Sequence, residues 1–210
     1  MTSEPEPDRL RRIVDVAVAG PAAVVLSPVM AVIALLVRLR MGRPVLFRQA
    51  RSGRGGQEFE IVKFRTMRAA ENDAEPDADR LTGLGRALRN ASLDELPQLW
   101  NVLRGDMSLI GPRPTLPEQV RRYSDHERRR LAVRPGLTGW AQVNGRNAIS
   151  WPDRIELDLW YIEHRSVALD LRILGRTVRN LFGAEGITGE GGVNPGFPGP
   201  SNAAESPPDR

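Results

Sequence analysis

The first apolar stretch of the chain is also its longest. From position 13 to position 37 it contains only two polar residues, Asp15 and Ser27. The stretch runs for about 25 residues, whereas about 20 are needed to cross the hydrocarbon core of a bilayer. It is also longer than the apolar region of a cleavable signal peptide. The pattern therefore predicts a membrane anchor over residues 13–37.

Arginines flank this stretch on both sides: Arg9, Arg11 and Arg12 precede it, and Arg38, Arg40 and Arg43 follow it. Basic residues beside a membrane segment mark its cytoplasmic end, so both ends are predicted to be cytoplasmic. Pro28 removes a helical hydrogen bond, and Ser27 can bond to the freed backbone. We therefore predict a re-entrant helix hairpin that bends at this pair. A kinked single span is the alternative.

The next segment alternates between apolar and polar residues. Residues 45–48 and 59–64 are strand-like and are separated by a Gly-rich turn, which predicts a hairpin. Alternation in the second strand places one set of residues on one face: Phe59, Ile61, Lys63 and Arg65. This mixed face has two interpretations. It is either a hairpin edge protected by charge, or a strand that delivers Lys63 and Arg65 to an anion.

The remaining pattern predicts helices and loops. We expect a surface excursion at 68–85, a short amphipathic helix at 86–90, a basic amphipathic helix at 116–133 on the membrane surface or packed on the domain, a ligand-binding loop at 134–151, and a helical region at 153–182 interrupted near Ser166. The expected fold class is α+β and mostly helical.

The expected domain organisation has four parts. It consists of a cytoplasmic N-terminus at 1–12, the re-entrant helix at 13–37, a catalytic domain at 38–182 and a Gly/Pro-rich tail at 183–210. The tail is too poor in apolar residues to bury enough surface to become ordered.

Composition narrows the chemistry. The chain has no cysteine and two histidines, which excludes thiol nucleophiles and thiolate metal sites and argues against a His-rich metal site. It has 30 Lys and Arg residues against 26 Asp and Glu residues, which favours an anionic partner. Lys63 is the only lysine. Either this position needs a compact ammonium group or the exception arose by chance.

The stretch SLDELPQLWN, residues 92–101, places two carboxylates side by side. Ser92 and Glu95 have the spacing of a capping box, in which each side chain satisfies an N–H group of the first helical turn. Asp94 would then favour the positive end of the helix dipole. The other interpretation of Asp94 and Glu95 is a reaction centre.

Arg113 lies between Pro112 and Pro114, whose rings restrict the backbone on both sides. A restrained arginine loses little freedom when it binds, and its planar guanidinium matches two phosphate oxygens. This turn is therefore either a phosphate clamp or a rigid turn with an exposed arginine.

Three segments carry a resemblance to a known family: KFRTM, SLDELPQLWNVLRGDMSLIGPRP and RPGLTGWAQVNGRNAISW. In this order, behind an anchor that contains Ser-Pro, they resemble the bacterial sugar transferases, the monotopic polyprenyl-phosphate phosphoglycosyl transferases. The resemblance covers residues 8–182. It is closest to the small form of the family, which has one catalytic domain and one re-entrant helix.

The resemblance implies transfer of a sugar-1-phosphate from a UDP-sugar to undecaprenyl phosphate, with release of UMP. It also implies a covalent phosphosugar on Asp94 and Mg²⁺ bound by Glu95. The family's phosphate-binding positions fall on Lys63, Arg89 and Arg113, with weaker matches at Arg134, Gln142 and Arg146. Catalysis then becomes the favoured interpretation of the carboxylate pair, because one carboxylate cannot fully serve as both metal ligand and helix cap.

Further expectations concern partners and location. The resemblance implies a lipid bilayer, the cytoplasmic face of the bacterial inner membrane, and later glycosyltransferases of the same pathway as candidate partners. The GRNAISW stretch is most similar to members that use N-acetylated amino sugars.

The rival hypothesis is a non-catalytic, membrane-anchored basic module that binds anionic lipid or nucleic acid. Nucleic acid is not expected, because aromatic residues, which stack on bases, make up only 5% of the chain. The rival also gives no reason for an Asp-Glu pair beside restrained cations.

Overall fold

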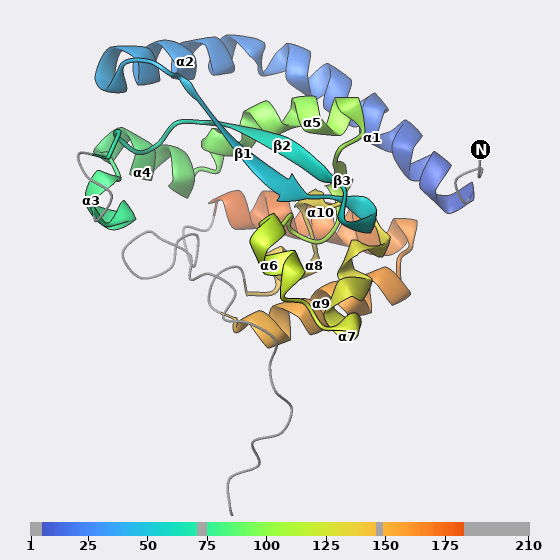
Figure 1. Cartoon of the computed structure of the whole chain (residues 1–210). Coiled ribbons are helices and arrows are strands. Elements are labelled where there is room, and N and C mark those ends of the chain that lie inside the picture. Colours follow the sequence, from blue (N-terminus) through green and yellow to red (C-terminus); the bar gives the residue numbers. More distant parts are fainter. Residues whose placement is uncertain (1–5, 71–74, 146–148, 183–210) are drawn as a thin grey trace, which may run out of the picture.

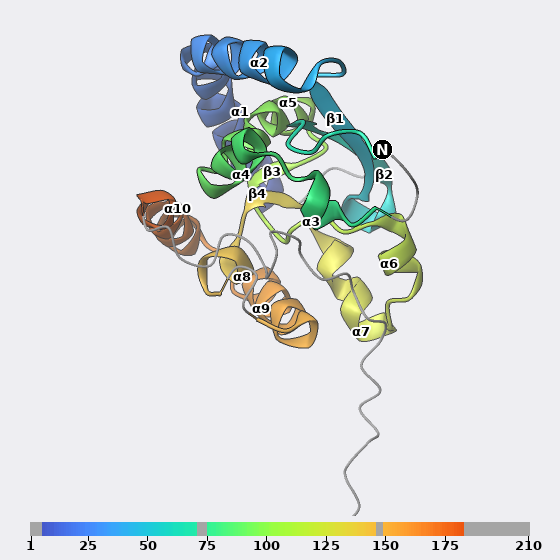
Figure 2. The ribbon, with the colours of Figure 1, turned by 90° about the vertical axis from the view of Figure 1, so that its left-hand side faces the viewer.

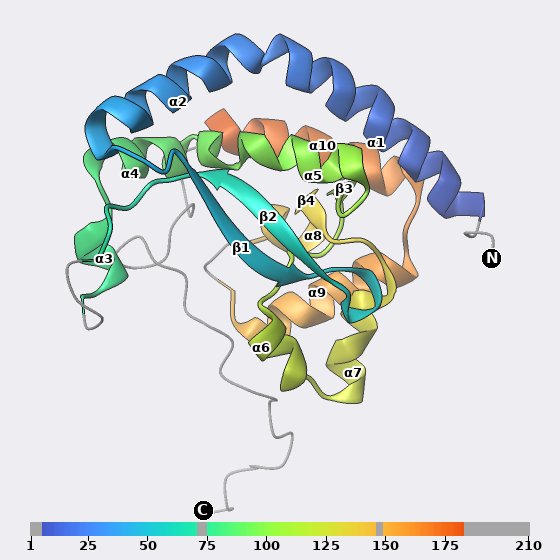
Figure 3. The same cartoon turned by 45° about the horizontal axis from the view of Figure 1, so that its top comes forward.

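The computed structural model describes residues 6–70, 75–145 and 149–182. Within them the fold is α+β and mostly helical, as expected, with two small two-stranded sheets. Two N-terminal helices, α1 (Glu6–Val25) and α2 (Ser27–Met41), form an arch over the rest of the molecule (Figures 1 and 3).

The arch bends where the sequence predicts a break. The axes of α1 and α2 differ by 58°. The Ser27 hydroxyl donates a hydrogen bond of 2.7 Å to the carbonyl of Val24, and Pro28 lies in the first turn of α2. Taken alone, neither helix is both long and apolar enough to cross a membrane, but the bent pair together meets that length and composition. A bend of 58° is far from a reversal, so the predicted hairpin is not confirmed.

The start of α1 is bound to the domain through polar contacts. Arg12 donates to the carbonyl of Leu103, at 2.5 Å, at the end of α5 (Leu99–Arg104). Asp15 accepts hydrogen bonds from the Leu109 N–H at 2.9 Å and from the Ser108 hydroxyl at 3.0 Å. Asp15 is only 4% exposed. The polar residue that interrupts the apolar run therefore points into the protein, where its lone pairs are satisfied.

The predicted hairpin is confirmed. Strands β1 (Leu46–Ser52) and β2 (Glu58–Phe64) pair antiparallel and are joined by a short 3₁₀ turn, η1 (Arg54–Gly56). Asn101 of α5 fixes β2 by accepting from the Val62 N–H at 3.2 Å and donating to the Glu60 carbonyl at 2.7 Å. Beneath the hairpin and α1 lies a core cluster of Ala19, Ile61, Leu99, Val102, Met107 and Leu109.

The predicted ligand loop at 134–151 contains regular structure. Its strand β4 (Gly136–Thr138) pairs parallel with β3 (Ser108–Ile110), and a short helix, α8 (Trp140–Val143), follows. The two backbones approach so closely that a Cβ on Gly136 would lie 2.0 Å from the nitrogen of Gly111. Glycine is therefore required where this segment crosses the turn that carries Arg113.

The prediction of one basic helix at 116–133 is wrong. The segment forms α6 (Pro117–Arg121), α7 (Asp125–Arg128) and the 3₁₀ turn η3 (Arg129–Ala132). Ser124 is the N-cap of α7. Its hydroxyl accepts from the Glu127 N–H, while the Glu127 carboxylate accepts from the Ser124 N–H. This capping box lets Val120 and Tyr123 pack against the helix that follows.

That helix, α9 (Trp151–Glu163), is followed by α10 (Val167–Phe182). The interruption near Ser166 is confirmed. Helices α6, α7 and α9 lie on the far side of the molecule from the arch (Figures 1 and 2). Val120 and Tyr123 of the 116–133 segment pack on α9, so packing on the domain is confirmed for this segment.

Candidate active site

The carboxylate pair lies in a 3₁₀ segment, η2 (Leu93–Gln98), directly after α4 (Gly83–Asn90). Ser92 has a left-handed backbone, with φ of 55°, and its side chain makes no capping hydrogen bond. The Glu95 carboxylate points to two cations instead of back to Ser92. The capping-box interpretation is therefore wrong.

Glu95 binds Lys63 and Arg113 through the same oxygen. Its Oε1 lies 2.5 Å from Lys63 Nζ and 3.0 Å from Arg113 Nη2. The side chains of Glu95 and Lys63 are 19% and 16% exposed, so water screens the contact little. Burial would raise the pKa of Glu95, but the two cations outweigh burial and lower it. Glu95 is therefore ionised throughout the physiological pH range.

The charge of Lys63 is only partly neutralised in this cluster. Burial and the neighbouring Arg113 lower the pKa of Lys63, while Glu95 and Asp94 oppose them. One shared carboxylate oxygen cannot fully neutralise two cations. The cluster is therefore suited to an additional anion.

Asp94 differs from its neighbour. Its side chain is buried, with the residue 8% exposed, yet it accepts no hydrogen bond from any residue in the described parts of the chain. Burial and the charge of Glu95 raise the pKa of Asp94, against Lys63, Arg89 and Arg113. Asp94 is thus a carboxylate whose oxygens are uncommitted and which is surrounded by cations.

Arg89 reaches this cluster from the end of α4. Its Nε donates to the Thr66 hydroxyl at 3.0 Å, and its charge acts on Asp94. Helix α4 approaches this segment so closely that a Cβ on Gly85 would lie 1.9 Å from the Thr66 carbonyl oxygen. Arg65 is not part of the site: it donates to the carbonyls of Arg43 and Gly42, at 3.1 and 3.2 Å, beyond the end of α2.

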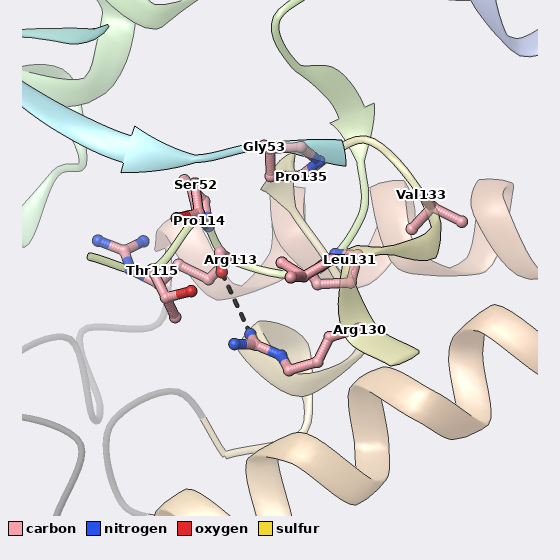
Figure 4. Close-up of a pocket in the computed structure, with 10 residues that line it drawn as sticks. Ser52, Gly53, Arg113, Pro114, Thr115, Arg130, Leu131, Val133 and Pro135 are labelled. Carbon is pink, nitrogen blue, oxygen red and sulfur yellow. Dashed lines mark hydrogen bonds between the residues drawn. The ribbon is translucent and has the colours of Figure 1, made fainter. Parts of the chain in front are cut away.

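A second ion pair supports the backbone of Arg113. Arg130 Nη2 donates to the Arg113 carbonyl at 3.2 Å and to Asp158 Oδ2 at 2.6 Å, and Nη1 donates to the Tyr123 hydroxyl at 2.6 Å. Figure 4 shows Arg130 reaching this carbonyl while the Arg113 side chain leads away from it. Burial lowers the pKa of Arg130, but Asp158 and Tyr123 more than offset burial and raise it.

Sequence reasoning missed this support. Asp158 has the helical spacing of the buried residues Ile155 and Leu159, and that spacing is the signal that could have revealed it. A charged residue on an apolar face is buried only with a partner. Arg130 gives no comparable signal within the RRRL run.

The site therefore unites four of the expected residues, Lys63, Asp94, Glu95 and Arg113, with Arg89 beside them. Arg134 is placed elsewhere, donating to the Gly105 carbonyl at 3.1 Å. Gln142 lies in α8, and both of its amide atoms are buried without a hydrogen-bond partner among the described residues. Arg146 lies outside the described residues.

The Asp94 and Glu95 carboxylates fit the ligand chemistry of Mg²⁺. Asp94 and the second oxygen of Glu95 accept no hydrogen bond from the described residues, and Mg²⁺ prefers such hard oxygen ligands. No group of three or more His, Cys, Asp or Glu residues able to hold a metal occurs in the described chain. An ion here would need further oxygens from substrate phosphates and water, which is how Mg²⁺ is commonly bound.

Comparison with known proteins identifies the family of the chain. The chain is 52% identical over 155 residues to the uncharacterized sugar transferase EpsL of Bacillus subtilis, covering 72% of this chain and 77% of that protein. It is 43% identical over 196 residues to a UDP-glucose:undecaprenyl-phosphate glucose-1-phosphate transferase of Caulobacter vibrioides, covering 83% and 70%.

A third relative is larger. The UDP-N-acetylgalactosamine-undecaprenyl-phosphate N-acetylgalactosaminephosphotransferase of Aeromonas hydrophila is 41% identical over 189 residues, which cover 83% of this chain and 45% of that protein. The family model described as bacterial sugar transferase matches residues 7–184, which include all of the arch except Glu6 and every described residue of the site. This chain belongs to the bacterial sugar transferase family.

Proposed function

We propose that this chain transfers a sugar-1-phosphate from a UDP-sugar to undecaprenyl phosphate and releases UMP. The observation that carries the proposal is the difference between two adjacent carboxylates. Glu95 is bound to Lys63 and Arg113, whereas Asp94 has no hydrogen-bond donor among the described residues and lies among cations. The names of the Caulobacter and Aeromonas relatives support the reaction class.

The proposed reaction has two steps. An Asp94 oxygen attacks the phosphorus attached to the sugar, and the bond from that phosphorus to the UMP oxygen breaks, so UMP leaves with the electron pair. An oxygen of undecaprenyl phosphate then attacks the same phosphorus. The bond to Asp94 breaks, which regenerates the carboxylate and yields the lipid-linked sugar diphosphate. Splitting one transfer into two makes each step easier.

The cations have separate tasks in this mechanism. Arg113, fixed between two prolines and by Arg130, can bind two phosphate oxygens at once. Lys63 supplies a compact charge beside Glu95 and Asp94. Both stabilise negative charge on the transferring group in a partly buried site, where electrostatic interactions are strong. Mg²⁺, bound by Glu95 together with substrate oxygens, would supply further stabilisation of the same kind.

We propose that the arch attaches the enzyme to the cytoplasmic face of the bacterial inner membrane. Apolar side chains are exposed along its outer side, including Val24 and Val25, each 73% exposed, and Leu39, which is 71% exposed. An exposed apolar surface of this extent is typical of membrane contact. Its two ends bind the same domain, through Asp15 in α1 and through Arg65 beyond α2. This arrangement supports a re-entrant insertion, because neither end is free to cross.

The proposed donor sugar is an N-acetylated amino sugar, on the strength of the GRNAISW sequence alone. The named relatives include transferases for glucose and for N-acetylgalactosamine. The test is incubation with undecaprenyl phosphate, Mg²⁺ and a panel of UDP-sugars that includes both classes, with UMP as the readout. We expect UMP from at least one donor. No UMP from any donor would favour the non-catalytic basic module.

A further inference from the structure

Arg51 lies at the end of β1 and is not among the residues already assigned to the site. In the hairpin, Arg51 is opposite Phe59 and Phe47 is opposite Lys63. Opposite residues share a face of the sheet, and so do alternate residues along a strand, so Arg51 and Lys63 lie on the same face. The Ser52 N–H donates to the Thr115 carbonyl at 2.9 Å, which joins the end of β1 to the turn that carries Arg113.

Among the described residues, the guanidinium of Arg51 has only neutral hydrogen-bond partners. Nη1 donates to the Pro114 carbonyl at 3.3 Å and Nη2 donates to Gln49 Oε1 at 2.6 Å, while Nε is buried without a partner from the same parts of the chain. In the described chain no carboxylate forms an ion pair with Arg51. Burial and the charge of Arg113 lower its pKa to about 10, against Glu95 and Glu118.

Arg130 shows what a structural arginine at this turn looks like. It also donates to a backbone carbonyl of the turn, but its charge is matched by Asp158, and the Tyr123 hydroxyl accepts a further hydrogen bond. A buried charge is normally paired in this way, because an unpaired one is costly. Arg51 is half-buried beside the same turn and has no such carboxylate among the described residues.

We propose that Arg51 is a phosphate-binding residue of the Asp94/Glu95 site. An anionic oxygen would satisfy its unbonded Nε and offset the repulsion between Arg51 and Arg113. The inference rests on the proposed function, because the phosphate would come either from the UDP-sugar or from undecaprenyl phosphate. Lys63, Arg113 and Arg51 then form one phosphate-binding surface with cations from both strands of the hairpin and from the proline-flanked turn.

The test compares Arg51→Gln and Arg51→Lys with a matched control, Arg48→Gln. Arg48 is on the same strand but on the opposite face, and it forms an exposed ion pair with Glu60. For each full-length variant we would measure KM for the UDP-sugar, KM for undecaprenyl phosphate, the dissociation constant of inorganic pyrophosphate by calorimetry, and the melting temperature.

Arg51→Gln is expected to raise the KM of one of the two substrates, and to weaken pyrophosphate binding, by about tenfold or more. The substrate whose KM rises identifies the source of the phosphate. Arg51→Lys should recover part of the loss because it keeps the charge. Arg48→Gln should leave all of these constants unchanged.

Unchanged substrate and pyrophosphate constants in Arg51→Gln, with a lower melting temperature or kcat, would overturn the inference and make Arg51 a positioning residue of the turn. A wild-type protein that releases no UMP would overturn the proposed function instead. The pyrophosphate titration needs no turnover, so it would still decide the role of Arg51 in that case.

Discussion

Two carboxylate–cation clusters lie close to the backbone of Arg113. In one, Asp158 binds Arg130 at 2.6 Å, with the two side chains 1% and 2% exposed. In the other, Glu95 binds Lys63 and Arg113, whose side chains are 16% and 36% exposed, and Asp94 lies beside them without a hydrogen-bond donor from the described residues. In the first cluster Arg130 and Asp158 form a closed one-to-one pair, whereas the second cluster is partly open and has more cations than bonded carboxylates.

The two clusters are expected to have different roles: the Arg130–Asp158 pair stabilises the fold, and the cluster around Glu95 binds an anion. Removing a partner from a matched, buried pair leaves a charge that water cannot reach, so the expected cost is a loss of stability. An unmatched cluster already carries an electrostatic cost in the free protein, and a bound anion relieves it. Arg130 links the two, because it holds the Arg113 carbonyl while remaining paired with Asp158.

The largest predicted effect is on activity at Asp94. Asp94→Asn should reduce UMP release by about a thousandfold or more, because an amide is a very poor nucleophile toward phosphorus. The same variant should be slightly more stable. Burial and Glu95 raise the folded-state pKa of Asp94 above its unfolded value, so ionised Asp94 destabilises the fold at neutral pH.

UMP release and thermal melting would test both parts, with the exposed Asp125→Asn as control. A lower melting temperature for Asp94→Asn would show that Asp94, like Asp158, stabilises the fold.

Burial also raises the pKa of Asp158, against Arg130 and Arg154, but this carboxylate is bonded to a buried cation, so Asp158→Asn should show the opposite pattern. It leaves Arg130 buried without its counter-charge, and we expect a loss of about 3–5 kcal/mol in the free energy of unfolding. Denaturant unfolding would measure the loss, and kcat per folded molecule would measure any effect on chemistry. Unchanged stability would show that this pair does not hold the fold.

How much of this comparison the sequence could predict depends on local geometry. The β-hairpin and the break at Ser27 follow from short-range pattern, and the place of Lys63 in one site with the carboxylate motif follows from the resemblance to the family. The ion pair between Lys63 and Glu95 was not predicted. The left-handed Ser92 could not be predicted, because it depends on how α4 and η2 pack.

The broken basic helix is a similar case. Its arginines have equal helical propensity, and only tertiary packing selects Arg130 for burial. Polar contacts along α1 were also missed, because hydropathy alone cannot distinguish a side of a helix that faces lipid from one that faces protein.

Arg113→Lys is predicted to lower kcat/KM by about 10- to 100-fold although it keeps the charge. A lysine cannot reproduce the two parallel hydrogen bonds that a guanidinium makes to phosphate. Steady-state UMP release would measure the effect, and Arg121→Lys, an exposed change on α6, is the control. Near-normal kinetics would mean that Arg113 is only an exposed arginine on a rigid turn.

Lys63→Arg should lower kcat/KM by a smaller factor, about tenfold, because a broader guanidinium must fit where a compact ammonium contacts Glu95. The melting temperature should change little, since the ion pair to Glu95 can still form. Full activity in the same UMP assay would show that the single lysine of the chain is a matter of chance.

The smallest predicted effect is on pH dependence. The pKa of Asp94 is raised above that of an ordinary aspartate, which is about 3.9. As the pH is lowered, Asp94 should therefore become protonated, and lose its nucleophilic form, at a higher pH than an ordinary aspartate would. A profile of kcat against pH would show this as an acid limb above that value. An acid limb at or below it would mean that the cations outweigh burial around Asp94.

The central claim is that Asp94 carries the sugar phosphate, and one measurement tests it most directly. The protein would be mixed with an active UDP-sugar and Mg²⁺ in the absence of undecaprenyl phosphate, and intact-protein and peptide mass spectra would be recorded beside a UMP assay. We predict one equivalent of UMP or less, and a mass increase of one sugar phosphate on the peptide that contains Asp94. This increase should be lost on addition of undecaprenyl phosphate and absent from Asp94→Asn. UMP formed only when the lipid acceptor is present, with no modified peptide, would contradict the account and indicate direct transfer between the two substrates.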